Sequence, residues 1–296
     1  MIQERETYFS LLDLNWRKRP GQATRIVLTY LALAIGAFIF LLPFFWLLST
    51  SLKPQSEVYV FPPTFFPRVF RWENFPEAWT YQGMMFDRWL LNSVLIAALV
   101  MVGAVASSTL CGFGFARISF PGRDLWFMAV LASIMLPGAV TLIPLYVGFY
   151  SIGWLDTIKP LTVPAFFGGG AFNIFLMRQF FKGLPIELEE AAIMDGASRL
   201  RILWQIFIPL SRPAMATVAV FTYQAVWNDF YLPLIYLKSQ EKLTVALGIH
   251  MFKGLYNTQI PYMMAMSWLM VIPMVVVFFL AQRLMIRGVI LTGIKA

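Results

Sequence analysis

Long, mainly apolar runs alternate with shorter polar segments along the whole chain. The first run, 26–48, contains 23 residues and no charged side chain. Because about 20 apolar residues cross a bilayer as a helix, this run is long enough to span a membrane. Five more runs of sufficient length follow, at 89–116, 125–155, 160–181, 213–236 and 263–281. The pattern predicts an all-α integral membrane protein with six transmembrane helices.

Proline and glycine residues interrupt two of these apolar runs. Pro137 and Pro144 interrupt the third run, which predicts a kink or an early end. Three glycines at 168–170 permit close helix contact or a local break in the fourth run, and close packing is the favoured interpretation. We therefore expect an N-terminal segment 1–25, a permeation domain 26–286 and a tail 287–296. Segment 1–25 reads either as an amphipathic surface helix or as a loose tail.

Composition and charge agree with a membrane location. Hydrophobic residues make up 59% of the chain and charged residues 13%, whereas soluble domains are about half apolar and a quarter charged. The net charge of +8 is distributed unevenly, because 15 of the 23 Lys and Arg residues fall on one side of a six-span arrangement. By the positive-inside rule, both termini and the loop 185–212 are expected in the cytoplasm. In a membrane protein such charge gives no reason to expect a nucleic acid partner.

The loop 185–212 has the polar pattern of a helix, a turn and a second helix. Pro185 and the acids Glu189 and Glu190 suit the start of a helix. Gly196 interrupts that helix, and Ser198 can cap the next one, which Pro209 would end. The segment predicts a docking surface between spans four and five, with an ordinary interfacial helix pair as the alternative.

Residues that would support catalysis are scarce. The chain has one His and one Cys, and none of its Lys residues follows a Gly, as a phosphate-binding loop would require. We expect no catalytic residue, no metal site and no cofactor in this chain. Transport energy would then come from a separate ATPase or from an ion gradient. The second alternative has thin support, because Asp229 is the one acid inside the predicted spans.

The spacing within the loop carries a family resemblance. Glu190-Ala191-Ala192 is followed by three residues and Gly196, then by nine residues and Ile206, and then by one residue and Ile208-Pro209. This spacing resembles the EAA loop of binding-protein-dependent ABC importer permeases, in which Leu is more common at the position of Ile208. From 168 to 296 the chain is similar to the smaller, maltose-type permease subunit of carbohydrate importers. The first half is similar only in its layout.

The resemblance implies partners and contact residues. It implies a second permease subunit of different sequence, two ATPase subunits that bind ATP and Mg, and an extracytoplasmic solute-binding protein, all at a bacterial or archaeal cytoplasmic membrane. The loop 238–261 would reach into the binding protein. The residues implied for ATPase docking are Glu190, Ala191, Ala192, Asp195 and Gly196, and those for the binding-protein loop are Thr244, Gly248, Gly254 and Asn257.

Candidates for solute contact are polar or aromatic residues inside the predicted spans. They are Asn92, Gln224, Trp227, Asn228 and Asp229. Ser107 and Ser108 could also face solute, but bonding to neighbouring helices is favoured for them. The resulting hypothesis is a permease subunit that translocates a sugar or oligosaccharide by alternating access driven by separate ATPases. Glycerol phosphate or an oligopeptide is the alternative solute, and an ion-coupled carrier is the alternative class.

Overall fold

The protein is helical throughout the residues that the computed structural model describes, 20–253 and 258–292, with side chains for 24–253 and 258–283. Within these ranges the strand-like structure is a single β-bridge between Lys253 and Thr258. The expected all-α fold is thus confirmed for the described part of the chain. Most of the segment 1–25 lies outside the described residues, and so do both interpretations considered for it.

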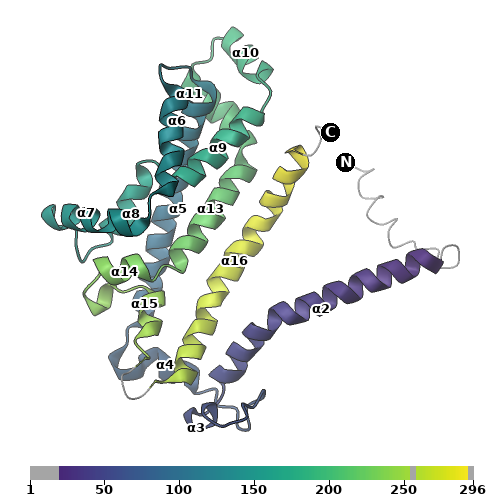
Figure 1. Ribbon diagram of the computed structural model, residues 1–296, viewed down its shortest axis with the longest axis vertical. Helices are drawn as coiled ribbons and strands as arrows, with labels where there is room; N and C mark the ends of the chain where they lie inside the picture. Colours follow the sequence, from purple (N-terminus) through teal and green to yellow (C-terminus); the bar gives the residue numbers. More distant parts are fainter. Residues whose placement is uncertain (1–19, 254–257, 293–296) are drawn as a thin grey trace.

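Five long helices form the body of the molecule (Figure 1). They are α2 (Pro20–Ser51), α5 (Phe86–Arg117), α9 (Ala171–Gly183), α13 (Arg212–Trp227) and α16 (Ile260–Thr292). Helix α5 packs between α9 and α13, and α16 packs on α13. Helix α2 meets α16 near one end and then diverges from the bundle. Its apolar side chains therefore remain exposed, as expected of a helix that faces lipid or another subunit.

Short helices connect the long ones. On the side of the molecule where α2 ends lie α3 (Gln55–Val58), α4 (Asn74–Thr80), α14 (Tyr231–Tyr236) and α15 (Val245–His250). Helices α6 (Arg123–Ala132), α7 (Gly138–Ser151) and α8 (Lys159–Thr162) join α5 to α9. Helices α10 (Glu187–Met194), α11 (Arg199–Ile202) and α12 (Ile208–Leu210), with a π-helical turn at Leu203–Phe207, join α9 to α13. The α10 end and the α15 end are therefore opposite ends of the bundle (Figure 1).

Among the described residues, four segments are long and apolar enough to cross a membrane: Thr24–Ser51, Phe86–Arg117, Lys159–Gly183 and Ile260–Arg283. Two bent helix pairs would raise the number to six if each is one span. One pair, Arg123–Met135 with Gly138–Ser151, bends by 99° at Pro137, so the interruption expected there is confirmed. The other, Arg199–Leu210 with Arg212–Trp227, bends by 75°. The number six stays a prediction.

The fifth predicted span is wrong as a continuous helix over 213–236. Helix α13 ends at Trp227, and α14 begins at Tyr231 after a break. The apolar pattern continues across the break, but Asp229 accepts hydrogen bonds from the backbone N–H groups of Tyr231 and Leu232 at 3.0 and 3.2 Å. This side chain satisfies the free donors at the start of α14, so the chain can turn there.

The glycines at 168–170 also produce a break. All three have positive φ, and they separate a 3₁₀ turn at Val163–Phe166 from α9. A Cβ atom on Gly169 would lie 2.6 Å from the carbonyl oxygen of Ala104 on α5. The two interpretations considered from the sequence are therefore both realised: a local break and a close helix contact.

Candidate functional site

The segment after α9 forms the expected helix, turn and helix. Helix α10 begins at Glu187, two residues later than Pro185, and ends at its C-cap Asp195. Gly196 follows with a φ of +78°, a left-handed conformation that Gly adopts without a Cβ penalty. Ser198 then accepts a hydrogen bond from the backbone N–H of Arg201 at 3.3 Å and caps α11. The sequence thus predicted the helix, the turn and the Ser198 cap. The expected end at Pro209 is wrong, because Pro209 lies in the first turn of α12, where its missing N–H is tolerated.

Helix α10 stands at the end of the bundle with two different faces (Figure 1). Glu190, Ala191 and Asp195 are exposed, as is Gly196. Ala192 is 9% exposed and packs in the cluster formed by the ends of α5, α9 and α13. The small side chain at 192 therefore lets α10 approach its own bundle, so a partner would meet the face of Glu190, Ala191 and Asp195.

The burial and ion pairing of Glu189 are the features of this segment that sequence reasoning missed. Its side chain is 7% exposed and forms ion pairs with Arg117, at 3.7 Å, and with Arg199. Arg117 is the last residue of α5, and Arg199 is the first of α11. The available signal was helical spacing, because residues 189 and 192 share one face three positions apart.

At the opposite end, Asp156 holds the loop that follows α14. Its carboxylate accepts hydrogen bonds from the backbone N–H groups of Lys238 and Ser239, both at 2.9 Å. The Ser239 hydroxyl and the Lys242 ammonium also donate to it, at 2.6 and 2.9 Å. Burial opposes ionisation of Asp156, but the hydrogen bonds from Ser239, Lys242 and Lys238 outweigh it and hold the pKa below its usual value. The loop is thereby fixed to the α7–α8 connection.

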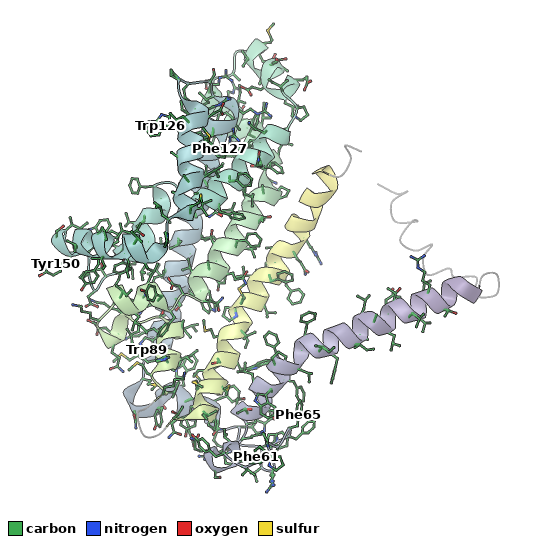
Figure 2. All side chains as sticks on the ribbon, in the orientation of Figure 1. Phe61, Phe65, Trp89, Trp126, Phe127 and Tyr150 are labelled. Carbon is green, nitrogen blue, oxygen red and sulfur yellow. The ribbon has the colours of Figure 1, made fainter. Side chains whose placement is uncertain are left out.

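Two residues expected to touch the binding protein lie inside the fold. Thr244 is 6% exposed and caps α15. Gly248 is buried against Trp89, and a Cβ atom there would lie 2.1 Å from a ring carbon of Trp89. Trp89 lies at this end of the bundle (Figure 2). Among the described residues of the loop 238–261, the exposed positions are instead Lys238, Gln240, Glu241, His250, Met251 and Lys253. Gly254 and Asn257 lie outside the described residues.

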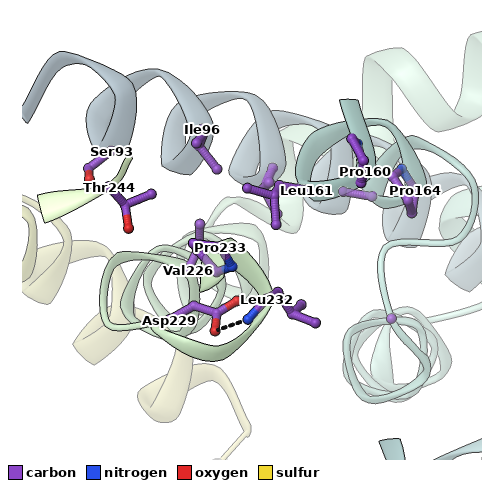
Figure 3. A pocket seen from close by; sticks show the side chains of 13 residues that line it. Ser93, Ile96, Pro160, Leu161, Pro164, Val226, Asp229, Leu232, Pro233 and Thr244 are labelled. Atoms are coloured by element: carbon purple, nitrogen blue, oxygen red, sulfur yellow. Dashed lines mark hydrogen bonds between the residues drawn. The ribbon is translucent and has the colours of Figure 1, made fainter. Parts of the chain in front are cut away.

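Asp229 borders a pocket of about 330 Å³ between α5, α8 and α14. Figure 3 shows Ser93 and Thr244 on one side of this pocket and Asp229 and Leu232 on the other. The pocket wall is mainly apolar, with Ile96, Leu161 and Pro233 among its side chains. Since Asp229 also accepts the hydrogen bonds from Tyr231 and Leu232 at the start of α14, its presence in the apolar run has a structural reason.

The other solute candidates do not gather around this pocket. Asn92 donates hydrogen bonds to the carbonyls of Glu241 and Leu243 at 2.9 and 3.0 Å. Trp227 is buried and donates to the carbonyl of Met270 at 3.0 Å. These two side chains already have structural partners. Gln224 and Asn228 are exposed on the other side of α13, where Gln224 borders a second pocket.

Two further candidate sites were considered, a metal site and the hydroxyl of Ser107. Among residues 24–253 and 258–283, no three His, Cys, Asp or Glu side chains lie close enough together to hold a metal ion. Ser107, considered for solute contact, donates hydrogen bonds to the carbonyls of Gly103 and Ala165 at 2.7 and 2.8 Å. It therefore joins α5 to the start of the fourth span, as the favoured interpretation predicted.

The described residues thus form a helical bundle with candidate membrane spans and, at one end, an exposed helix–turn–helix. The chain also matches a family over residues 104–289, more than half of its length, described as "Binding-protein-dependent transport system inner membrane component". The chain belongs to this family and is an ABC importer permease subunit, a transport component rather than an enzyme.

Two named relatives are similar over most of their length. The arabinooligosaccharides transport system permease protein AraQ of Halalkalibacterium halodurans is 30% identical over 88% of this chain and 94% of its own. The sn-glycerol-3-phosphate transport system permease protein UgpE of Yersinia pestis is 32% identical over 89% of this chain and 95% of its own. Among solved structures, a bacterial ABC transporter involved in import of the acidic polysaccharide alginate has a similar fold, with a TM-score of 0.75. The match covers 90% of this chain and 98% of that one, at 22% identity.

Proposed function

We propose that this subunit translocates a sugar or oligosaccharide across a bacterial or archaeal cytoplasmic membrane by alternating access. A second permease subunit of different sequence, two ATPase subunits carrying ATP and Mg, and an extracytoplasmic binding protein complete the transporter. The α10 end, both termini and the loop 185–212 face the cytoplasm in this proposal. The exposed face of α10, formed by Glu190, Ala191 and Asp195, is the observation that carries it.

This face suits a protein partner that bears Arg or Lys. Carboxylates at Glu190 and Asp195 can accept charge-assisted hydrogen bonds, and Ala191 between them leaves room for a close approach. Gly196 turns the chain away directly afterwards. The outer partner would meet the opposite end, at His250, Met251 and Lys253.

The charge around the pocket favours an uncharged solute over glycerol phosphate. Asp229 is the charged residue among the described side chains that line it, and none of them is Lys or Arg. A phosphate group would lack a cation there and would meet a carboxylate, which costs free energy. A polyol can use hydroxyl and carboxylate groups such as those of Ser93, Thr244 and Asp229. Similarity to the arabinooligosaccharide permease supports the same choice.

The test is reconstitution of the assembled transporter in lipid vesicles with its binding protein. We expect ATPase subunits to copurify with this chain, and ATP hydrolysis to rise with maltose or arabinotriose but not with sn-glycerol 3-phosphate. If only sn-glycerol 3-phosphate stimulates ATP hydrolysis, the solute is glycerol phosphate and the sugar proposal is wrong. Uptake that persists without ATPase subunits and collapses with the ion gradient would identify an ion-coupled carrier instead.

A further inference from the structure

Glu189 and Glu190 are neighbours in α10, but they lie in opposite environments. Glu190 is exposed, whereas Glu189 is 6% exposed and points into the end of the bundle. Charged side chains are rarely buried unless they are paired. The contacts of Glu189 therefore need an explanation that the docking surface alone does not give.

Arg117 connects Glu189 to two long helices. Its Nε and Nη2 atoms donate to the carbonyl oxygen of Phe181 at 3.2 and 2.6 Å, and Nη2 also donates to the carbonyl of Leu184. These carbonyls end α9, while Arg117 itself ends α5. The remaining nitrogen, Nη1, lies 3.7 Å from Oε2 of Glu189, an ion-pair distance. One guanidinium thus joins α5, α9 and α10.

Arg199 and Phe207 extend the contact to the second half of the loop. Nη1 of Arg199, at the start of α11, donates to Oε1 of Glu189. The guanidinium of Arg117 also lies over the ring of Phe207, 5.1 Å from its centroid, in the turn before α12. The carboxylate is therefore held from two directions, by one buried and one half-exposed guanidinium.

Stability alone is a weak reason for such a group. Burying charges costs desolvation energy, and apolar residues of similar size often stabilise a fold as well or better. A carboxylate between two guanidiniums does fix direction, because both partners must keep their geometry. If α10 moves, Glu189 pulls on Arg117, and Arg117 pulls on the ends of α5 and α9.

We propose that Glu189 is a positioning residue that transmits movement of the docked α10 to the ends of α5 and α9. The inference rests on the proposed function, in which an ATPase subunit grips the outer face of α10. Glu190 then makes the contact with the ATPase, and Glu189 carries the resulting displacement into the bundle through Arg117.

The experiment compares the assembled transporter in lipid vesicles with its Glu189→Gln variant. The measurements are the amount of bound ATPase subunit, the rate of ATP hydrolysis, and maltose or arabinotriose uptake per ATP hydrolysed. Gln keeps the shape but removes the charge that both guanidiniums need. We expect the ATPase subunits to stay bound and uptake per ATP to fall about tenfold, within the range of coupling changes seen away from ligand sites. Arg199→Gln removes only the half-exposed partner, so we expect a smaller fall, about threefold.

Glu57→Gln is the matched control, because Glu57 is equally buried at the opposite end, where it accepts hydrogen bonds from Thr64 and the backbone of Arg68. This variant should unfold at a lower temperature without a change in uptake per ATP. Three results would overturn the inference: unchanged uptake per ATP in Glu189→Gln, loss of its ATPase subunits, or an equal fall in Glu57→Gln. A wild-type complex without ATPase subunits would instead overturn the proposed function.

Discussion

The two ends of the bundle each hold a loop with one carboxylate, but they hold it in different ways. Glu189 at the α10 end is held by the side chains of Arg117 and Arg199. Asp156 at the α15 end is held by two backbone N–H groups, a hydroxyl and the Lys242 ammonium. The first arrangement joins helices through long side chains, and the second fixes a short stretch of backbone.

The difference indicates what each end can do. Backbone donors within a short loop have little freedom, so the Asp156 contact sets the conformation of 238–242. Paired side chains between separate helices keep their geometry only if those helices move together. In the proposed transporter, the α15 end would present a surface of fixed shape to the outer partner, and the α10 end would transmit force to the bundle. The following substitutions test this contrast.

The largest effect is expected from reversing the charge at Glu190. Glu190→Lys would oppose a cationic groove on the ATPase, and like charges across an interface cost several kcal/mol, so docking should weaken by about a hundredfold or more. Copurification of ATPase subunits measures the loss. Glu241→Lys, the same change at an exposed site of the opposite end, should leave copurification intact. Equal retention of ATPase by both variants would contradict a docking role for α10.

A methyl group at Gly248 is expected to destabilise the α15 end. Because the new Cβ would lie 2.1 Å from the ring of Trp89, Gly248→Ala should cost about 1–3 kcal/mol through overpacking. The thermal unfolding midpoint in lipid nanodiscs measures the change. Gly114→Ala is the control, since its Cβ meets open space, and it should be neutral or slightly stabilising. If both variants have the same unfolding midpoint as wild type, the loop does not pack on Trp89.

Asp156→Asn is expected to cost about 2 kcal/mol at neutral pH, because the charge-assisted bonds to Lys242 and Ser239 are weakened. The pKa of Asp156 is lower in the folded state than its usual 3.8, so its stabilisation is present above that value. It is lost as the pH falls through the folded-state pKa. Unfolding at a series of pH values should show a gap between wild type and variant that is constant above about pH 5 and shrinks below about pH 4. A gap that widens in acid would contradict the assignment.

The smallest effect is expected at Asn92. Asn92→Ala removes two hydrogen bonds to the backbone of 241 and 243, which should lower stability by about 1 kcal/mol and leave the KM for sugar uptake unchanged. Asn228→Ala is the comparison, because Asn228 is exposed and remains a solute candidate. A raised KM with unaltered stability in Asn92→Ala would return Asn92 to the solute pathway.

Sequence patterns predicted the elements that are determined by residues close together in the chain. The apolar runs of α2, α5 and α16 specified long helices, and Gly196 with Ser198 specified the turn beside α10. The break after Trp227 was missed because apolar residues continue through 231–236, and a single capping carboxylate interrupts them. The pattern of apolar residues does not show that one hydrogen-bonding side chain will end the helix.

Contacts between residues that are distant in the chain could not be predicted from sequence patterns. The motif pointed to Glu190, but the burial of Glu189 depends on Arg117, 72 positions earlier. Likewise, Thr244 and Gly248 were expected on a contact surface, whereas Thr244 is 6% exposed and Gly248 packs against Trp89 on α5. Which face of a short helix points inward is decided by partners that only the folded chain brings together.

The packing of α2 on α16 has a consequence for the order of membrane assembly. About 200 residues separate the end of α2 at Ser51 from the start of α16 at Ile260. At 5–20 residues per second, synthesis of this interval takes roughly 10 to 40 seconds. Helix α2 must remain stable in lipid for that time with its own backbone hydrogen bonds and without its main neighbour. Its continuous apolar surface, unlike the partly buried surface of α5, gives it that independence.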